Sequence, residues 1–251
     1  MKRRPLIAGN WKMHATSLEA QQLASAVVHA ANKVSGRDVM IAPPYTALAV
    51  VNTLLSGTDV ILGAQNVHWE EQGAFTGEIS ALMLKDLGCS MAIVGHSERR
   101  HVFSETDYMI NRRIMGALQF GLIPVFCIGE TLKQREAAQT MKVLEDQIRA
   151  GLAGIELSDG TRIVVAYEPV WAIGTGKTAT ETQAQEVHSF IRTLLAEIYD
   201  KKIAGQIRIL YGGSVKPENI DILMQQYDID GALVGGAALK AEMFERIICF
   251  H

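Results

Sequence analysis

Side chains suited to proton-transfer chemistry follow several short apolar runs of this 251-residue chain. Asn10 and Lys12 come just after the first run, His96 after the fourth, and Glu168 after the sixth. A carboxylate is a candidate general base, an imidazole a hydrogen-bond donor, and a lysine a fixed positive charge for an oxyanion. Any one of them alone is usually a solvated or ion-paired group. A base, a cation and an imidazole that meet at one face would instead form a catalytic site.

Two glycine pairs predict that the ligand of this site carries a phosphate group. Gly212 and Gly213 precede Ser214, and Gly235 and Gly236 follow the last apolar run. Glycine lets the backbone approach a ligand closely, and N–H groups at a following helix start favour an anion. Either pair alone could be an ordinary turn, but barrels commonly bind phosphate in the loops after strands seven and eight. We therefore expect Ser214, Gly235 and Gly236 to bind phosphate.

The segment 170–179 predicts a loop that closes over the substrate. It follows Pro169, which cannot continue a sheet ladder, and it carries Trp171 and Ile173. Apolar side chains in a loop are explained if closure removes them from water. We expect Gly174 to add a backbone N–H to the phosphate site. The alternative is a loop that packs permanently on the rest of the protein.

His96 directly precedes residues 97–100, which predict the start of a short helix. A helix N-terminus disfavours the imidazolium, so we expect a neutral His96 that donates a hydrogen bond to the substrate. A structural histidine bonded to the backbone is the alternative. The other histidines have no metal-ligand spacing, so the sequence predicts no metal site.

The elements that would bring these residues together alternate eight times along the chain. Each strand candidate is a continuous apolar run, as expected for parallel strands buried on both faces. Segments with helical periodicity lie between them, and capping-box patterns that begin at Thr16, Ser104 and Thr178 predict helix starts. The eight runs are 6–8, 39–41, 60–62, 91–94, 122–128, 163–166, 207–210 and 232–234.

This alternation predicts an α/β fold, a closed (β/α)8 TIM barrel of eight parallel strands ringed by helices, with residues 1–251 as a single catalytic domain. The rival is a doubly wound open sheet. Such a sheet would begin with a strand and a G-x-G-x-x-G turn, but the first strand here runs into Gly9-Asn10-Trp11-Lys12. In a barrel the active site forms at the carboxyl ends of the strands, where the candidate residues occur.

Composition argues against several classes of protein. The formal net charge is −3, from 24 basic and 27 acidic residues, without the basic excess of a nucleic-acid binder. Three scattered cysteines argue against a disulfide framework or a zinc site and indicate a reducing compartment. We find neither a signal-peptide pattern nor a run of the ~20 apolar residues that span a membrane. We therefore expect cytoplasmic localisation, with no nucleic-acid and no membrane partner.

Five segments resemble the triosephosphate isomerase family, and the resemblance covers essentially the whole chain in order. They are 8–13, 94–100, 166–176, 211–215 and 234–237. The resemblance implies a glycolytic and gluconeogenic isomerase that interconverts dihydroxyacetone phosphate and D-glyceraldehyde 3-phosphate through an enediolate, without cofactor or metal.

The resemblance also implies a role for each candidate residue. Glu168 would be the base that moves a proton between two carbons, and neutral His96 would shuttle protons between the two oxygens. The pairing of a carboxylate base with a neutral histidine is already documented for triosephosphate isomerases, so this assignment comes from the family and not from the sequence alone. Lys12 would stabilise developing negative charge, while Asn10 orients the substrate. Glu98 resembles a further active-site residue of the family, and a purely structural ion pair with Lys12 is the alternative.

The resemblance also implies a homodimer, because the family forms homodimers. Residues 65–78 resemble the interlocking loop of that dimer, and long loops in compact barrels usually have a function of this kind. Thr76 would then approach Asn10 and Lys12 of the other subunit. One position departs from the family, which usually has serine where this chain has Ala238. Because residues 239–244 predict the last helix, we expect a serine at 238 to accept a backbone N–H and to raise stability.

Two other functions remain compatible with a phosphate-binding barrel. One is an aldolase that uses Lys12 as a Schiff-base nucleophile. The other is a barrel that binds a phosphorylated ligand without catalysis, which would need neither Glu168 nor His96.

Overall fold

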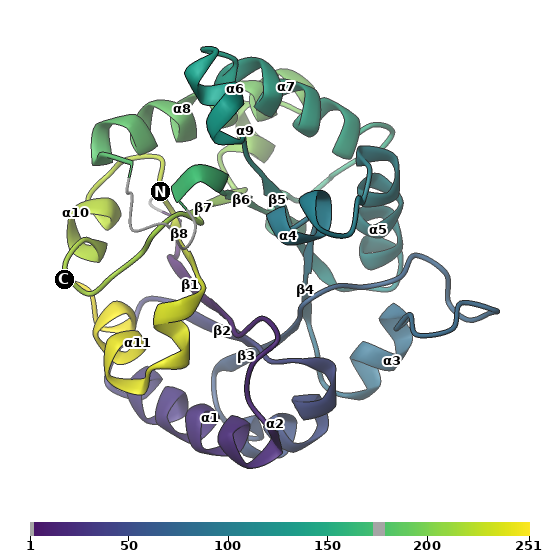
Figure 1. Cartoon of the computed structure of the whole chain (residues 1–251), viewed down its shortest axis with the longest axis vertical. Helices are drawn as coiled ribbons and strands as arrows, with labels where there is room; N and C mark the ends of the chain where they lie inside the picture. Colours follow the sequence, from purple (N-terminus) through teal and green to yellow (C-terminus); the bar gives the residue numbers. More distant parts are fainter. Residues whose placement is uncertain (1–2, 173–178) are drawn as a thin grey trace.

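Eight parallel strands close into one barrel (Figure 1). The structure is a computed structural model that describes residues 3–172 and 179–251. Each strand pairs with the next along the chain, and β1 pairs with β8, so the predicted fold class is confirmed. The strands are β1 (Leu6–Asn10), β2 (Asp38–Ala42), β3 (Val60–Ala64), β4 (Met91–Val94), β5 (Ile123–Ile128), β6 (Val164–Tyr167), β7 (Arg208–Tyr211) and β8 (Gly231–Val234).

Burial on both faces explains why the strands are continuous apolar runs. Leu6 and Ala8 of β1 belong to the cluster that fills the barrel, whereas Ile7 between them belongs to the layer under the helices. Met40 of β2 fills the barrel beside Gly63, where an added Cβ would lie only 2.0 Å from the methionine methyl group. The barrel is therefore a packed core, and any ligand must bind at one of its ends.

Helices ring the barrel on the outside (Figure 1). Most strands are followed by a helix that returns the chain to the start of the next strand. The helices are α1 (Ser17–Ala31), α2 (Leu48–Leu55), α3 (Ala81–Asp86), α4 (Ser97–His101), α5 (Asp107–Gln119), α6 (Leu132–Glu136), α7 (Thr140–Gly151), α8 (Glu181–Ile198), α9 (Lys201–Ala204), α10 (Ile220–Met224) and α11 (Ala241–Ile248).

Only one of the three predicted capping boxes is confirmed. Thr16 caps α1, and the Glu19 side chain accepts the Thr16 backbone N–H at 2.7 Å. The start of α5 was predicted wrongly, because Thr106 caps it and Ser104 has a left-handed φ of 56°. The box predicted at 178 is also wrong, because Thr180 caps α8 together with Gln183. The segment from 178 to 183 contains two overlapping capping-box patterns, and the sequence alone does not choose between them.

Position 238 does not start a helix, so the predicted cap at this position is wrong. Ala238 lies inside a short 3₁₀ helix (Gly236–Leu239), and the N-cap of α11 is Lys240. The Ala238 side chain is fully buried, and its N–H already donates to the Gly235 carbonyl at 2.8 Å. A Cβ on Gly9 would lie 3.2 Å from the Ala238 methyl group, so the surrounding space is filled.

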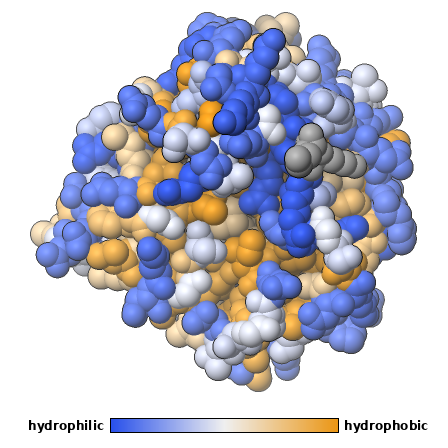
Figure 2. Space-filling model, turned by 180° about the vertical axis from the view of Figure 1, so that it is seen from behind, coloured by the Kyte–Doolittle hydropathy of each residue, from blue (hydrophilic) through white to orange (hydrophobic). Residues whose placement is uncertain are grey.

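Ion pairs tie together the amino ends of several strands. Asp38 at the start of β2 pairs with Arg4 and with Arg208 of β7. Asp230, just before β8, pairs with Arg3 and with Arg192 of α8. In the view from behind, hydrophilic side chains surround an apolar area (Figure 2). These six charged side chains are thus paired within the fold. None of the helices within 3–172 and 179–251 combines the length and apolar content needed to cross a membrane.

Candidate active site

A cavity of about 490 Å³ lies at the carboxyl ends of the strands and brings together most of the predicted site residues. Gly174 lies outside the described residues, and Thr76 does not line the cavity. The predicted residues that line it are Asn10, Lys12, His96, Glu98, Glu168, Ser214, Gly235 and Gly236. These residues follow five different strands, so the barrel, rather than any local motif, creates the site.

Asn10 and Lys12 reach the cavity through a tight turn after β1. Asn10 is the last residue of the strand and is almost completely buried, and its Oδ1 accepts the Lys12 backbone N–H at 3.0 Å. Lys12 has a left-handed φ of 52°, which is uncommon for a residue with a long side chain. The turn directs the lysine side chain inward, toward the glycine loop after β8.

The Lys12 ammonium lies beside a glycine turn and a carboxylate. Its Nζ pairs with Glu98 Oε1 at 2.7 Å. A Cβ on Gly235 would lie 3.3 Å from Lys12 Cε and 3.8 Å from Nζ. Glu98 is nearly half exposed, and such a pair contributes only about 0–1 kcal/mol to stability. Structural stabilisation alone is therefore a weak explanation for Lys12.

Glu168 directly follows β6 and projects its carboxylate into the floor of the cavity. Only 2% of the residue is exposed. Its Oε1 lies 3.0 Å from His96 Nε2, and its Oε2 accepts the Ser97 backbone N–H at 2.9 Å. Burial raises the pKa of Glu168, but His96, the Ser97 N–H and Lys12 together lower the pKa below its ordinary value. The group is thus buried but ionised, and hydrogen bonds from His96 and the Ser97 N–H hold its negative charge.

His96 is the N-cap of α4, which follows β4 as the sequence predicted. Its Nδ1 accepts the Glu98 backbone N–H at 3.3 Å. An imidazolium has no lone pair for that bond, so we assign the neutral tautomer with the proton on Nε2, facing Glu168.

The direction of the His96 pKa shift differs from the prediction. Burial lowers the pKa of His96, but the Glu168 carboxylate raises it by more, and the pKa lies above its ordinary value. The position of His96 at a helix N-terminus predicted a lowered pKa for the imidazole. The prediction failed because the sequence does not show that the Glu168 carboxylate lies against the His96 ring. The hydrogen bond to Nδ1 and the raised pKa favour opposite protonation states. The Nδ1 hydrogen bond fixes the neutral ring, because the influence of Glu168 on the His96 pKa lasts only while the carboxylate faces the imidazole.

Close approach of neighbouring atoms explains the glycines at positions 212, 213 and 235. A Cβ on Gly212 would lie 2.8 Å from Glu168 Cγ, and one on Gly213 would lie 2.3 Å from the Tyr211 hydroxyl. Gly235 makes room for Lys12, as described above, and Gly236 begins a 3₁₀ helix. A larger side chain at position 212 would displace the candidate base, and one at position 235 would press on the candidate cation.

The sequence analysis missed Glu130, a fully buried carboxylate after β5. Its Oε1 accepts bonds from the Tyr167 hydroxyl at 3.1 Å and from Trp171 Nε1 at 2.9 Å. It therefore anchors the start of the predicted closing loop, of which residues 173–178 lie outside the described residues. Only its position after an apolar run could have identified Glu130, because its partners come from a distant strand and loop.

A metal site is not apparent in this cavity. In the parts of the chain that the structure describes, no three histidine, cysteine, aspartate or glutamate side chains are grouped closely enough to hold a metal ion.

Comparison with known proteins agrees with this geometry. A sequence profile described as triosephosphate isomerase matches residues 5–251. A triosephosphate isomerase of Syntrophotalea carbinolica is 56% identical over 248 residues, which cover 99% of this chain and 98% of that protein. That of Geotalea uraniireducens is 54% identical and covers 99% of both chains. One from Endomicrobium trichonymphae is 52% identical over 98% of both. The chain therefore belongs to the triosephosphate isomerase family.

Proposed function

We propose that this protein interconverts dihydroxyacetone phosphate and D-glyceraldehyde 3-phosphate in the cytoplasm, as a step of glycolysis and gluconeogenesis. The observation that carries the proposal is the buried Glu168 carboxylate, 3.0 Å from His96 Nε2, on the floor of a cavity rimmed by two glycine turns. We further propose that residues 1–251 form a single catalytic domain that needs no cofactor.

Glu168 acts as the general base in this proposal. It removes a proton from the carbon next to the carbonyl and returns that proton to the neighbouring carbon. Substrate replaces His96 as the partner of Oε1, while the Ser97 N–H continues to hold Oε2. General base catalysis of this kind contributes about 10²–10⁴-fold to the rate.

His96 donates its Nε2 proton to the substrate oxygens as negative charge develops on the enediolate. When Glu168 turns to the substrate, the influence that raises the pKa of His96 moves away, and burial then favours the neutral ring. The Glu98 N–H keeps Nδ1 unprotonated and fixes the orientation of the ring. One preorganised donor of this type contributes about 10²–10³-fold.

The remaining residues bind and orient the substrate. Lys12 supplies positive charge between the oxyanion and the phosphate, and Asn10 lies beside it at the end of β1. In this proposal the backbone N–H groups of Ser214, Gly235 and Gly236, which line the cavity, bind the phosphate. Together these groups favour a small dianion in the cavity.

We also propose that the loop after Pro169 closes over the bound substrate and brings the Gly174 N–H to the phosphate. Loop closure is a documented property of triosephosphate isomerases. In this chain it is supported by the start of the loop, which packs on Glu130 through Trp171. Closure would keep water away from the enediolate.

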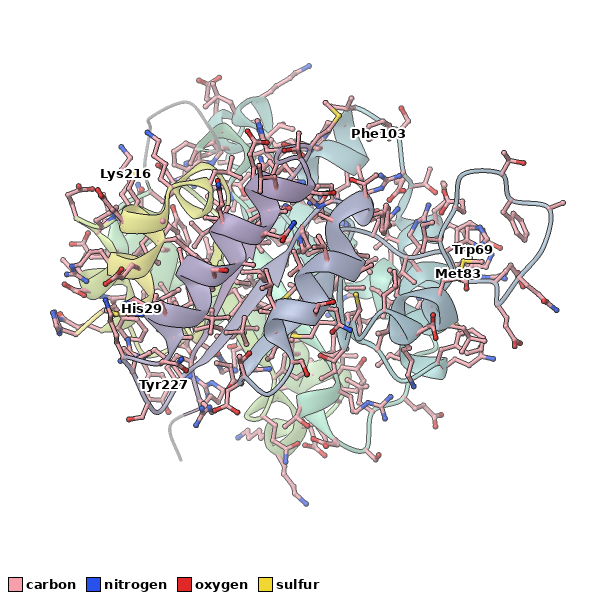
Figure 3. All side chains as sticks on the ribbon, turned by 90° about the horizontal axis from the view of Figure 1, so that it is seen from below. His29, Trp69, Met83, Phe103, Lys216 and Tyr227 are labelled. Atoms are coloured by element: carbon pink, nitrogen blue, oxygen red, sulfur yellow. The ribbon has the colours of Figure 1, made fainter. Side chains whose placement is uncertain are left out.

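A homodimer through loop 65–78 is the assembly that we propose. Met83 and Phe103 lie on the same side of the molecule as the projecting loop that carries Trp69 (Figure 3). Met83 and Phe103 are exposed, as is Met13, which is 93% exposed in the isolated chain. Large apolar side chains that are exposed on one side of a molecule favour an interface there. In the dimer, Thr76 would approach the active site of the other subunit.

The two rival functions have less support. A Schiff-base lysine is normally activated in an apolar pocket or beside another cation, whereas Lys12 is paired with Glu98. A barrel that only binds its ligand has no need for a buried carboxylate against an imidazole.

A coupled assay for glyceraldehyde 3-phosphate formation tests the proposal, with Glu168→Gln as the matched control. We expect turnover by the wild type and a loss of at least about 10²-fold in the variant. Absence of turnover by folded wild-type protein would refute the proposal. Borohydride trapping of an adduct on Lys12 would support the aldolase instead.

A further inference from the structure

The backbone at Lys12 is held in a conformation that its own sequence does not favour. The φ of 52° is left-handed, and this conformation costs about 1–2 kcal/mol for a residue that has a Cβ. Such strain persists only where surrounding contacts hold it, and it is common at functional sites. Contacts from residues near Lys12 must therefore stabilise the turn.

Gln65 makes the contacts that can stabilise this turn. Its Nε2 donates to the Lys12 carbonyl at 2.7 Å and to the Ala42 carbonyl at 2.9 Å. Ala42 ends β2 and Gln65 follows β3, so the amide joins the ends of two strands to the loop after β1 (Figure 1). Ala42 also accepts the Trp11 N–H at 3.1 Å. The backbone on both sides of the Lys12 Cα is thus attached to neighbouring strands. The Trp11 N–H is bound to the end of β2, and the Lys12 carbonyl is bound to the residue that follows β3.

The conformation of this turn decides where the Lys12 ammonium lies. Asn10 holds the Lys12 N–H from one side, and Gln65 holds the Lys12 carbonyl from the other. The side chain then runs beside Gly235 to Glu98. If the carbonyl were released, φ could relax to an ordinary negative value, and the Cα–Cβ direction would turn away from the cavity.

We propose that Gln65 is a positioning residue that holds Lys12 in the strained turn and so places its ammonium against the substrate phosphate and oxyanion. Gln65 does not itself line the cavity. The proposal rests on the proposed isomerase function, and it adds a residue that acts only through Lys12.

The first test replaces the amide by a side chain of similar length that cannot donate, Gln65→Met. Misplacement of a catalytic group by about 1 Å costs on the order of 10²-fold, so we expect kcat/KM to fall by about 10–100-fold. Asn111→Leu is the matched control. The Asn111 Nδ2 also donates to two backbone carbonyls, Gly151 at 2.9 Å and Ala153 at 3.0 Å, but remote from the cavity. We expect this control to lower Tm by a similar amount and to leave kcat/KM unchanged.

A double-mutant cycle with Lys12→Met separates positioning from general damage. If Gln65 acts through Lys12, the Gln65→Met loss in kcat/KM should shrink to less than about 2-fold in the Lys12→Met background. A loss that persists at full size there would overturn the proposal, as would wild-type kcat/KM in Gln65→Met alone. A loss that disappears as enzyme concentration rises would also overturn it, because weakened dimerisation would then be the cause.

A binding measurement keeps this proposal distinct from the proposed function. The dissociation constant of glycerol 3-phosphate can be measured by calorimetry without turnover. We expect Gln65→Met to raise this dissociation constant by about 3–30-fold and Asn111→Leu to leave it unchanged. If wild-type protein shows no isomerase activity but this difference is found, the proposed function fails and the positioning of Lys12 stands. Equal affinities in all three proteins would refute the positioning role.

Discussion

Lowering the pH should weaken the folded state through one buried histidine, His188 of α8. The residue is completely buried, and its Nδ1 lies 3.2 Å from the Asp228 carbonyl oxygen, to which it donates as the neutral ring. The rings of Tyr167 and Tyr211 lie at centroid distances of 5.9 and 6.3 Å. Within the described residues its Nε2 has no hydrogen-bond partner. A proton added there would be buried, and Asp228 compensates only part of the cost of burying the charge.

The size of the effect follows from the pKa. Burial, assisted by Arg192 and opposed by the Asp228 carbonyl, lowers the pKa of His188 from 6.5 to about 3. Between these values the unfolded chain binds a proton that the folded protein does not, so stability falls as pH falls. Linkage gives a loss of about 0.8 kcal/mol near pH 6 and about 2 kcal/mol near pH 5, relative to alkaline pH. The difference between the two conditions is about 1.2 kcal/mol.

The assay compares urea unfolding of wild type and His188→Gln near pH 6 and pH 5. The glutamine amide can still donate to Asp228 but does not titrate. All other titrating groups, including the coupled pair His96 and Glu168, are present in both proteins and largely cancel in the comparison. Protein concentration must be equal throughout, because a dimer makes stability depend on concentration. We expect the wild type to lose about 1.2 kcal/mol more than the variant between the two conditions.

Two results would refute this reasoning. Parallel losses of stability in both proteins would mean that His188 does not carry the linkage. A midpoint near 6.5 in the NMR titration of the His188 ring, in folded protein, would mean that the site can accept a proton. Lower stability of His188→Gln by the same amount at both pH values would leave the prediction intact, because the titration of His188 changes only the pH dependence of stability.

Four further changes test the site. Glu168→Asp should fold normally but lose on the order of 10²-fold in kcat, since the carboxylate is withdrawn by one methylene; near wild-type kcat would contradict the base role. Lys12→Met should raise KM and lower kcat together, whereas a purely structural pair with Glu98 predicts a lower Tm in thermal unfolding with unchanged kinetics. Lys216 is exposed at the cavity mouth (Figure 3), without an ion pair in the described part of the chain. Lys216→Gln should therefore lower kcat/KM about 2- to 5-fold at low ionic strength and have no effect at high salt, as expected for electrostatic steering. Ala238→Ser should lower Tm by a few degrees in calorimetry, because the cap that would add ~1 kcal/mol has no site there and the added hydroxyl enters buried, filled space; a clear rise in Tm would mean that the serine does cap a helix.

Most of the barrel could be predicted because its signals are local. Each strand is buried on both faces, so each apolar run is continuous and visible without knowledge of its neighbours. Closure of the sheet follows from eight such runs and predicts that Asn10, His96 and Glu168 share one end. Helix starts could be predicted less precisely, because two capping-box patterns overlap between residues 178 and 183 and only the one that begins at Thr180 caps α8.

What could not be predicted depends on contacts between distant segments. The pKa of His96 was expected to fall because only its own helix was visible in the sequence, whereas Glu168 is separated from it by 72 positions along the chain. Ala238 was assigned to a helix start because nothing local showed that its methyl group fills space beside Gly9.

The strained turn at Lys12 shows why residue types alone did not define this site. Lysine has no preference for a left-handed φ, so the sequence after β1 gives no sign of the conformation. The stabilising contacts come from Gln65, after β3, and from Asn10, on β1 itself. A side chain that acts at a distance in sequence can be found only once the strands are arranged. The resemblance to a family predicts which residues would touch the substrate, but the structure is needed to find those that hold them in place.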